Sequence, residues 1–229
     1  PGTGSDLQAI KTYAVKDGDD YILNGSKTFI TNGQLANLII VACKTDREKG
    51  AQGVSLLVLE TDGLAGFERG RNLEKIGLSS QDTSELFFNN VRVPQKNLLG
   101  SVEGMGFIQL MQELPQERLI IALAAAGAIK KSIELTIEYT KERHAFNKPV
   151  RSFQNTRFKL AECNADYLAV RAMCDAALEA HLNKKLTVQH AALLKAFTTD
   201  KQAKVTDECL QLFGGYGYML EYPIARLYA

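Results

Sequence analysis

An acidic side chain stands at the head of a long apolar run in the stretch MQELPQERLIIALAAAGA. Glu117 and Arg118 directly precede residues 119–128, which are all small or aliphatic. A buried carboxylate is costly unless it is paired, or unless its raised pKa makes it a better base. Arg118 is a poor partner, because neighbours along a helix point in different directions. Glu117 is therefore the first candidate for acid–base chemistry.

A second interpretation of Glu117 involves no chemistry. The Leu114-Pro115 step predicts a break between two helices, which would leave Glu117 in the first turn of the second helix. An acid in a first turn is stabilised by the helix dipole, and a proline often begins such a turn. Glu113 is a rival acid, but it lies before the proline.

Two segments near the N-terminus could hold a flat or anionic ligand. In PGTGSD, glycines such as Gly4 let backbone N–H groups approach an anion, and Ser5 can donate to a phosphate. In KTFITNG, Phe29 and Thr31 are two residues apart and so face the same side of a strand. The ring can stack on a flat heterocycle and the hydroxyl can bond it. Taken alone, each segment is more often a surface turn or a cross-strand aromatic.

Two segments in the second half have similar potential. RHAFNK places Arg143 at the end of a predicted helix, where it can pair with the helix dipole or reach a phosphate. LQLFGGYGY follows the last long helix. Its glycines, Gly214 and Gly215, can end that helix or let an adenine or pyrophosphate come close to the backbone.

Composition excludes several classes of function. Hydrophobic residues make up 45% of the 229 residues and charged residues 23%, which is typical of globular proteins. The net charge is +1 without a basic stripe, so nothing indicates nucleic-acid binding. No apolar run is long enough to span a membrane.

The three histidines lack metal-ligand spacing, so we expect no metal. The cysteines have no CxxC spacing and are expected to be reduced, mostly buried thiols; they are Cys43, Cys163, Cys174 and Cys209.

The two parts of the chain differ in periodicity. Residues 1–102 hold short β-branched runs separated by turn signals at DGDD and at Asn24-Gly25. NLIIVACKT and GVSLLVLE predict buried strands, and ELFFNNVRVP predicts a strand that ends at Pro94. Residues 103–229 have helical periodicity, and we expect helices at about 104–113, 116–142, 153–182 and 187–213. The fold class is therefore α+β: an antiparallel sheet or small barrel followed by an antiparallel helical bundle.

Two of the predicted helices have a defined apolar face, which normally packs against the core. On the helix at 153–182 this face consists of Phe158, Ala161, Ala165, Leu168 and Ala172. On the helix at 187–213 it consists of Ala191, Val205, Cys209 and Leu212. The small residues 122–127 suit either a deep ligand pocket or close helix packing, and the sequence favours neither.

Five segments, in order, resemble motifs of the acyl-CoA dehydrogenase family. PGTGSD is similar to the family's (E)PGxGSD loop, and KTFITNG to its flavin-contacting strand. FFNNVRVPQKNLLG followed by EGMGF resembles its passage from sheet to helices. RHAFNK resembles RxxFGK, and QLFGGYGY resembles QxxGGxGY. One such motif is weak support, whereas five collinear motifs that cover essentially the whole chain are strong support.

The resemblance implies a fold and a reaction. The family has an N-terminal helical domain and a final helix and loop, both of which this chain is expected to lack. Its members carry out FAD-dependent α,β-dehydrogenation of acyl-CoA thioesters, in which a carboxylate removes the α-proton and N5 of FAD accepts the β-hydride. In the long-chain and isovaleryl branches the base lies on the helix that matches PQERL. Glu117 occupies that position, and LPQERLIIA is most similar to the long-chain branch. Medium- to long-chain acyl-CoA, in fatty-acid β-oxidation, is the expected substrate.

The resemblance also implies binding residues and partners. Gly4 and Ser5 would contact FAD, Ser5 also the substrate, and Phe29 and Thr31 would bracket the isoalloxazine; Arg118 would lie near CoA. The FAD of a neighbouring subunit would be held by Arg143, Phe146, Gln154, Gln211, Gly214 and Gly215. A homo-oligomer, a dimer of dimers, is therefore expected, with an electron-transfer flavoprotein as electron acceptor.

The sequence departs from the family motifs at one position. Asn147 stands where the family motif has glycine, which puts the local loop geometry in question. The absent tail would supply a backbone N–H that polarises the thioester, so the chain alone should bind FAD poorly and turn over little. Alternatives are an isovaleryl-type enzyme for short branched chains and a non-catalytic scaffold of the same fold. A bacterial cytoplasm and a mitochondrial matrix both fit.

Overall fold

The computed structural model describes residues Pro1–Ala229, which divide into two units. Residues Pro1–Gln112 form the β unit and residues Glu113–Ala229 form the helical unit. The division falls inside the long helix α1 (Gly106–Glu142), because the first turns of that helix pack on the β unit. Gly106, for example, lies so close to the backbone of Ser55 that an added Cβ would be 2.9 Å from it. Domains at 1–102 and 103–229 remain our proposed division of the sequence.

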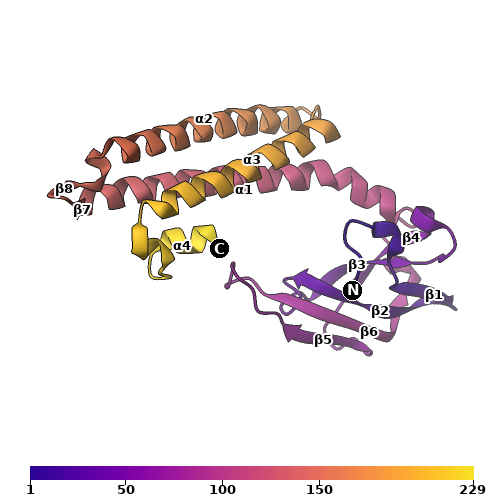
Figure 1. The fold of residues 1–229 in the computed structure, drawn as a ribbon. Helices are drawn as coiled ribbons and strands as arrows, with labels where there is room; N and C mark the ends of the chain where they lie inside the picture. The colour runs from indigo at the N-terminus through magenta and orange to yellow at the C-terminus, as the bar shows by residue number, and fades with distance from the viewer. The chain divides into compact units, whose positions relative to one another are not determined.

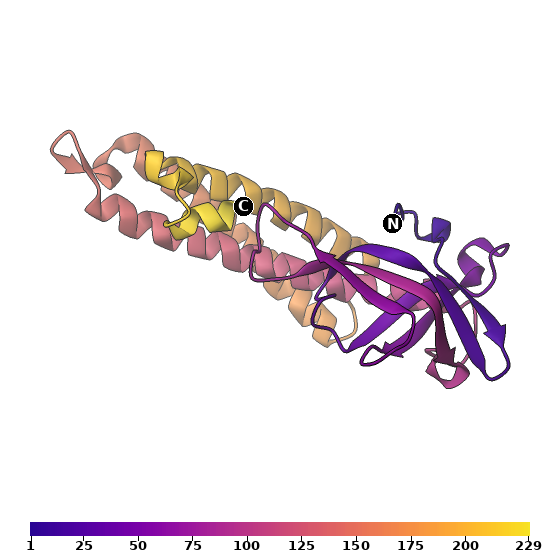
Figure 2. The same cartoon turned by 90° about the horizontal axis from the view of Figure 1, so that it is seen from below.

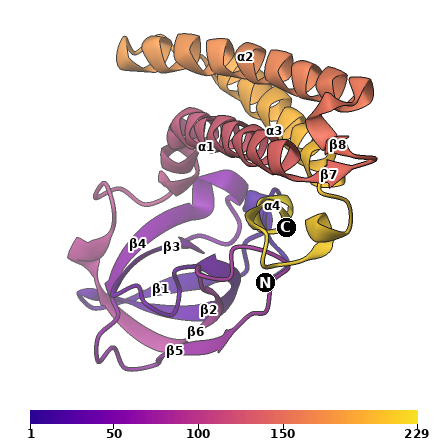
Figure 3. The same cartoon turned by 90° about the vertical axis from the view of Figure 1, so that its left-hand side faces the viewer.

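The β unit is built on one six-stranded sheet (Figure 3). Its strands lie in the order β4-β3-β1-β2-β6-β5. Their bounds are Tyr13–Asp17 (β1), Asp20–Thr31 (β2), Leu38–Lys44 (β3), Val54–Glu60 (β4), Phe67–Asn72 (β5) and Thr83–Pro94 (β6). Neighbouring strands are antiparallel, as predicted, except that β1 and β3 pair in parallel through Tyr13 and Lys44. The sheet is therefore mixed, which corrects the purely antiparallel expectation.

One face of this sheet carries the core of the β unit. Alternate residues of the central strands are buried, as in Tyr21 and Leu23 of β2 and Leu86 and Phe88 of β6. This period of two is the pattern that predicted the strands. Strand β5 was not predicted, because its sequence FERGRN is polar and has no alternation.

The predicted turn at Asn24-Gly25 is wrong, because both residues lie inside the long strand β2. The pairing of β2 with β6 shifts register between Leu23 and Gly25, which marks a β-bulge. Gly25 has φ of 137°, and a Cβ there would lie 2.7 Å from the Cα of Thr12. The glycine therefore serves a strained, crowded bulge rather than a hairpin.

The helical unit contains three long helices that run alongside one another in Figures 1 and 2. After α1 come the short strands β7 (His144–Ala145) and β8 (Lys148–Pro149), then α2 (Gln154–Leu182), α3 (Val188–Gln211) and α4 (Pro223–Tyr228). The bounds of α2 and α3 agree with the sequence periodicity. Thr187 accepts a hydrogen bond from the N–H of His190 and so caps the start of α3.

The predicted break at Leu114-Pro115 is wrong, because α1 continues through Pro115. A proline inside a helix removes one backbone hydrogen bond and costs about 3 kcal/mol. Residues 111–113 are exposed, and packed turns lie on both sides of the proline. We attribute the continuity to this packing, which outweighs the local cost. Glu117 is therefore not in a first turn, and the helix-dipole interpretation of it is removed.

Alternating spacings of three and four place one stripe of α1 in the core of the helical unit. The stripe consists of Leu119, Ala122, Ala126, Ile129 and Ile133, all buried. It packs with buried residues of the other helices, among them Cys163, Val170 and Cys174 of α2 and Leu194, Val205 and Cys209 of α3. Ala122, Ala125 and Ala126 therefore serve close helix packing, whereas Ala124 and Gly127 remain exposed. All four cysteines are buried free thiols, as expected.

The apolar face predicted for α2 does not face this core. Thr156, Cys163, Val170 and Cys174 are the buried residues of α2. The predicted face, with Phe158 and Leu168, lies on the opposite side of the helix and is exposed. Sequence spacing identified an apolar face correctly, but that face is uncovered within the chain.

Candidate functional site

Glu117 lies on the exposed side of α1, about three turns beyond its first residue. It takes part in no ion pair of the chain. Ile120 and Ile121, one turn further along, are exposed to 57% and 46%. Ala124 and Gly127 continue the same side, and a Cβ added at Gly127 would meet open space. An unpaired carboxylate thus stands at the head of an uncovered apolar stripe, which we call the α1 stripe: Glu117, Ile120, Ile121, Ala124 and Gly127.

Two charged residues near Glu117, Glu113 and Arg118, lie in different surroundings on α1. Glu113 is exposed one turn earlier on the same side of α1, so it offers the same chemistry at a place without the isoleucines. Arg118 is half-buried and forms no ion pair with Glu117. Its guanidinium remains available for an anionic ligand.

A groove of about 640 Å³ lies at the other end of α1, within the helical unit. Four of the predicted site residues line it: Arg143, Gln211, Gly214 and Gly215. Arg143 follows the last residue of α1, Gln211 ends α3, and the glycines begin the 3-10 helix Gly214–Tyr218. Gly214 has φ of 59°, and an added Cβ at either glycine would meet open space. The bare backbone is therefore accessible to a ligand.

An aromatic cluster that the sequence analysis missed forms the floor of this groove. The rings of Tyr139 and Phe213 stack at 4.1 Å between centroids, and the Tyr139 hydroxyl donates to the Phe213 carbonyl at 3.1 Å. Burial raises the pKa of Tyr139, so its hydroxyl stays protonated. The guanidinium of Arg143 lies 5.8 Å from the centroid of Tyr216. Tyr139 lies one helical turn before Arg143, so the sequence alone could have predicted that the two side chains lie on the same face of α1.

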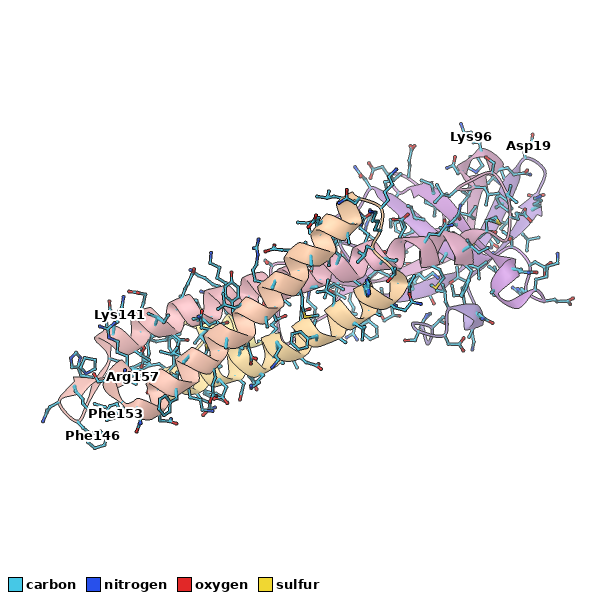
Figure 4. The ribbon with its side chains drawn as sticks, turned by 90° about the horizontal axis from the view of Figure 1, so that it is seen from above. Asp19, Lys96, Lys141, Phe146, Phe153 and Arg157 are labelled. Atoms are coloured by element: carbon cyan, nitrogen blue, oxygen red, sulfur yellow. The ribbon has the colours of Figure 1, made fainter.

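Two predicted residues lie outside the groove. Phe146 is exposed at the tip of the β7–β8 hairpin. The centroid of its ring lies 6.1 Å from that of Phe153 (Figure 4). Gln154 is exposed at the start of α2. Phe146 and Asn147 form the tight turn with φ of 51° and 63°. Asparagine tolerates this left-handed conformation, so Asn147 supports a turn that glycine would also allow.

One of the predicted residues of the β unit, Phe29, lines a hollow of about 810 Å³. The hollow is lined by parts of the opening loop, the segment before β1 and the second half of β2, including Phe29. Phe29 has φ of 61° at a second register shift of β2 and is exposed to 77%. Thr31 is also exposed, whereas Ile30 between them packs on the core. Gly4 and Ser5 are exposed in the loop but do not line the hollow.

A half-buried cation, Lys27, lines the same hollow and was not predicted. Its ammonium group donates to the carbonyl of Ala42 at 2.7 Å, and no carboxylate pairs with it. Burial lowers the pKa of Lys27, and the nearby Cys43 opposes this shift. A lysine two residues before an exposed ring on a strand is only weak evidence for a ligand site, because charged residues commonly flank strands.

The hollow of the β unit and the groove of the helical unit each have features that suit a ligand. An exposed ring and hydroxyl on β2 suit a planar heterocycle, and the groove of the helical unit joins aromatic faces to a guanidinium. No three His, Cys, Asp or Glu side chains gather where they could hold a metal ion. None of the helices is both long and apolar enough to cross a membrane.

The comparisons with known proteins agree with this picture. The profile of the acyl-CoA dehydrogenase C-terminal domain matches residues 104–229, and that of the middle domain matches residues 1–91. The long-chain specific acyl-CoA dehydrogenase of Sus scrofa, a mitochondrial protein, is 50% identical over 230 residues. That match covers 100% of this chain and 53% of the relative, so the chain spans about half the length of the curated relatives it matches.

Two solved structures are similar over the whole chain. An acyl-CoA dehydrogenase from Geobacillus kaustophilus has a TM-score of 0.96 and 51% identity, covering 100% of this chain and 60% of that one. A glutaryl-CoA dehydrogenase from Mycobacterium smegmatis, in complex with FADH2, has a TM-score of 0.92 and 32% identity. The match covers 100% of this chain and 57% of that protein.

Proposed function

Because the chain belongs to the acyl-CoA dehydrogenase family, we propose that the protein carries out FAD-dependent α,β-dehydrogenation of long-chain acyl-CoA, with Glu117 as the base. The observation that carries this proposal is the unpaired carboxylate at the head of the α1 stripe. The carboxylate and the isoleucines beside it are exposed to water, so the arrangement adds little to folding stability. The arrangement is useful where an apolar ligand that has an acidic proton covers both the carboxylate and the isoleucines.

Glu117 would remove the α-proton of the bound thioester. In the chain its carboxylate is exposed to water. An acyl chain laid over Ile120 and Ile121 would exclude that water and strengthen the carboxylate as a base. We also expect the 229-residue chain alone to turn over little, because Glu117 and the isoleucines beside it are open to water in it.

The residues of both units fit FAD. Phe29 and Thr31 would lie against its ring system, and Gly4 and Ser5 would contact it from the opening loop. Bound FAD would supply the acceptor for the β-hydride. The groove with Arg143, Gln211, Gly214 and Gly215 would take the adenine and phosphates of a neighbouring copy, with Phe146 and Gln154 beside it. This sharing requires a homo-oligomer, which we propose to be a dimer of dimers.

Substrate and partners follow from the same proposal. Arg118 and Ser5 would contact the CoA portion, whose phosphates are anionic. An electron-transfer flavoprotein would take up the electrons. The relative from Sus scrofa is mitochondrial and the similar structure from Geobacillus is bacterial, so we propose a mitochondrial matrix or a bacterial cytoplasm.

The length of the α1 stripe favours a long acyl chain. Ten residues separate Glu117 from Gly127, which corresponds to roughly 15 Å along a helix. A short branched acyl group would cover only the isoleucines, leaving the open space at Gly127 unused. The long-chain specific relative, at 50% identity, supports the same substrate class.

Turnover by the full-length gene product tests this proposal. With palmitoyl-CoA, Glu117→Gln is expected to lower kcat by about 10²–10⁴-fold, the range of general-base catalysis. Glu113→Gln, which removes an exposed acid one turn away, should change kcat less than about threefold. Equal losses in both variants, or none in either, would contradict the assignment of the base.

A second measurement tests the acyl chain separately. Ala124→Phe, in the middle of the α1 stripe, is expected to lower kcat/KM for palmitoyl-CoA by about 10–100-fold while leaving butyryl-CoA little changed. Ala203→Phe, at an exposed alanine of α3, serves as the matched control. Faster turnover of isovaleryl-CoA than of palmitoyl-CoA would overturn the substrate class but leave Glu117 as base.

A further inference from the structure

The proposed dehydrogenation leaves one nucleophilic side chain of the β unit, that of Lys27, without a role. It lies on β2 where the sheet opens, because β1 pairs with β2 only as far as Asn24 and with β3 only through Tyr13 and Lys44. Residues of β2 beyond Asn24, Lys27 and Phe29 among them, line the hollow of about 810 Å³. An amine therefore borders a space that is large enough for part of a ligand.

The surroundings of Lys27 favour its uncharged form. Its ammonium group donates to the carbonyl of Ala42 on β3 at 2.7 Å and takes part in no ion pair of the chain. Burial lowers the pKa of Lys27, and the nearby Cys43 opposes this shift. A lysine that is shielded from water and has no acid partner is the kind that acts as a nucleophile. The neutral amine can keep one N–H on the Ala42 carbonyl while its lone pair stays free.

A second lysine of the hollow offers an internal comparison. Lys11 lines the same space from the segment before β1 and also takes part in no ion pair. It is exposed, so water solvates its charge, whereas Lys27 is half-buried. The two amines thus share one ligand space and differ in their contact with water.

We propose that Lys27 is a modification site, acylated by the thioester of an acyl-CoA bound beside the hollow. The inference rests on the proposed function, because the β-carbon of the acyl group must come next to the flavin and so next to Phe29. A thioester carbonyl carbon is an electrophile that a free amine attacks. Binding both groups at one place raises the rate of their reaction over that of a lysine in solution.

The step balances without an oxidant or a reductant. The free amine of Lys27 attacks the thioester carbonyl carbon, and an N–C bond forms. The C–S bond then breaks, coenzyme A leaves as a thiolate, and the proton lost by the nitrogen goes to this thiolate. The products are an Nε-acyl-lysine and free coenzyme A. The modification replaces a cation with a neutral amide, and the acyl chain occupies the hollow beside Phe29.

Peptide mapping by mass spectrometry tests the assignment. The full-length gene product, with bound FAD, is incubated anaerobically with palmitoyl-CoA, and the position of any palmitoyl or hexadecenoyl group is determined after digestion. Lys27 is expected to acquire the acyl group at least about tenfold faster than Lys11, because only its amine is shielded from water beside the bound thioester. Equal rates at the two lysines, or no acyl group at Lys27, would overturn the proposal.

A thioether analogue shows whether the bound thioester is the donor. Hexadecyl-CoA has no carbonyl, so it can occupy the site without transferring an acyl group. In excess it should slow acylation of Lys27 by about tenfold or more, since it displaces the donor. Lys185, which is exposed just after α2, is the control and should react at an unchanged rate. Unchanged acylation of Lys27 would show that thioester free in solution is the donor, against the proposal.

Two variants separate the amine from its charge. Lys27→Arg keeps the positive charge but removes the nucleophile, so the acyl group at this position should disappear. Lys11→Arg should leave acylation of Lys27 as it is in the wild type. Circular dichroism shows whether both variants fold, and the mapping of the wild type decides the question even if Lys27→Arg does not. Loss of the acyl group at Lys27 in Lys11→Arg would assign the nucleophile wrongly.

The flavin absorption of the same samples separates this inference from the proposed function. Bleaching without an acyl group at Lys27 would overturn the inference and leave the dehydrogenation in place. An acyl group at Lys27 without bleaching would support the inference and count against the dehydrogenation.

Discussion

The two units hold their candidate side chains by different physical means. In the β unit, Phe29 is exposed through a left-handed backbone with φ of 61°, between two irregular pairs of β2 and β6. In the helical unit, Glu117 is exposed by an unbroken helix that continues through Pro115. The strand position depends on strain supported by distant neighbours, whereas the helix position depends on regular geometry supported by one packed stripe.

This difference has a consequence for mutation. A strained position has few acceptable residues, because its conformation persists only where the surroundings enforce it. A regular helix accepts any good helix former on its exposed side and gains stability when an irregular residue is removed. Substitutions in the β unit should therefore destabilise, and selected substitutions in α1 should stabilise.

The largest effect is expected for Gly25→Ala. A Cβ at this residue would lie 2.7 Å from Thr12 and would require a side chain at φ of 137°, so we expect a loss of about 3 kcal/mol or more. Gly18→Ala is the matched control, because Gly18 also has positive φ but open space around it. It should cost about 1 kcal/mol. Equal losses in urea denaturation would show that crowding at Thr12 contributes nothing.

The opposite sign is expected for Pro115→Ala. The substitution restores the N–H that can bond the carbonyl one turn earlier, and it should raise the free energy of unfolding by up to about 3 kcal/mol. Pro223→Ala, at the first residue of α4 where proline is favourable, should give no gain. A loss of stability at Pro115 would mean that the proline shapes α1 for packing.

Polar contacts hold the segment before α1 on the β unit. The Tyr21 hydroxyl donates to Oε1 of Glu103 at 2.6 Å, and Nζ of Lys16 lies 2.9 Å from the same carboxylate. Partial burial tends to raise the pKa of Glu103, but the hydrogen bonds from Tyr21 and Lys16 outweigh it and hold this pKa below its ordinary value of 4.5. The lowered pKa means that this contribution is complete above about pH 4.5 and is lost as the pH falls below it.

Glu103→Gln should therefore cost up to about 1 kcal/mol at pH 7, because the carboxylate is partly exposed. As the pH falls below 4.5, the difference in stability between the wild type and the variant should shrink. Thermal unfolding of both proteins from pH 7 down to pH 3.5 measures the difference. A difference that stays constant across this range would show that the charge of Glu103 has no part in it.

The smallest effect is expected for Gly127→Ala. A Cβ there meets open space in the middle of α1, so the substitution should stabilise the chain by about 0.5–1 kcal/mol. Ala124→Gly, the opposite substitution on the same side of α1, should destabilise the chain by a similar amount. If the α1 stripe accommodates an acyl chain, Gly127→Ala should also slow turnover of palmitoyl-CoA more than that of butyryl-CoA. A destabilising Gly127→Ala would contradict the open space seen beside this residue.

The same contrast explains which elements the sequence predicts. Spacings of three and four are local, so α2 and α3 were predicted with nearly their observed bounds. The bulge at Gly25 depends on β6, more than sixty residues away, so Asn24-Gly25 looked like a turn. Pro115 predicts a helix break from its local properties, but packing on both sides of it keeps α1 continuous. Spacing also identified the apolar face of α2 that contains Phe158 and Leu168, but it could not predict that the rest of the chain leaves this face exposed.

The candidate site was predictable to a similar extent. The sequence motifs identified Arg143, Gln211, Gly214 and Gly215, which the structure brings together in one groove. The aromatic floor formed by Tyr139 and Phe213 was missed, because stacking between residues of α1 and the end of α3 is a tertiary contact. Lys27 was missed for the same reason, since its burial depends on β3.

An anaerobic titration of the bound flavin tests whether Glu117 is the catalytic base. The full-length gene product, with bound FAD, is titrated with palmitoyl-CoA while the visible absorption of the flavin is followed, beside Glu117→Gln and Glu113→Gln. We expect that the wild type and Glu113→Gln lose this absorption, and that Glu117→Gln keeps both its flavin and its colour. Equal bleaching of Glu117→Gln and the wild type would place the base elsewhere in the protein.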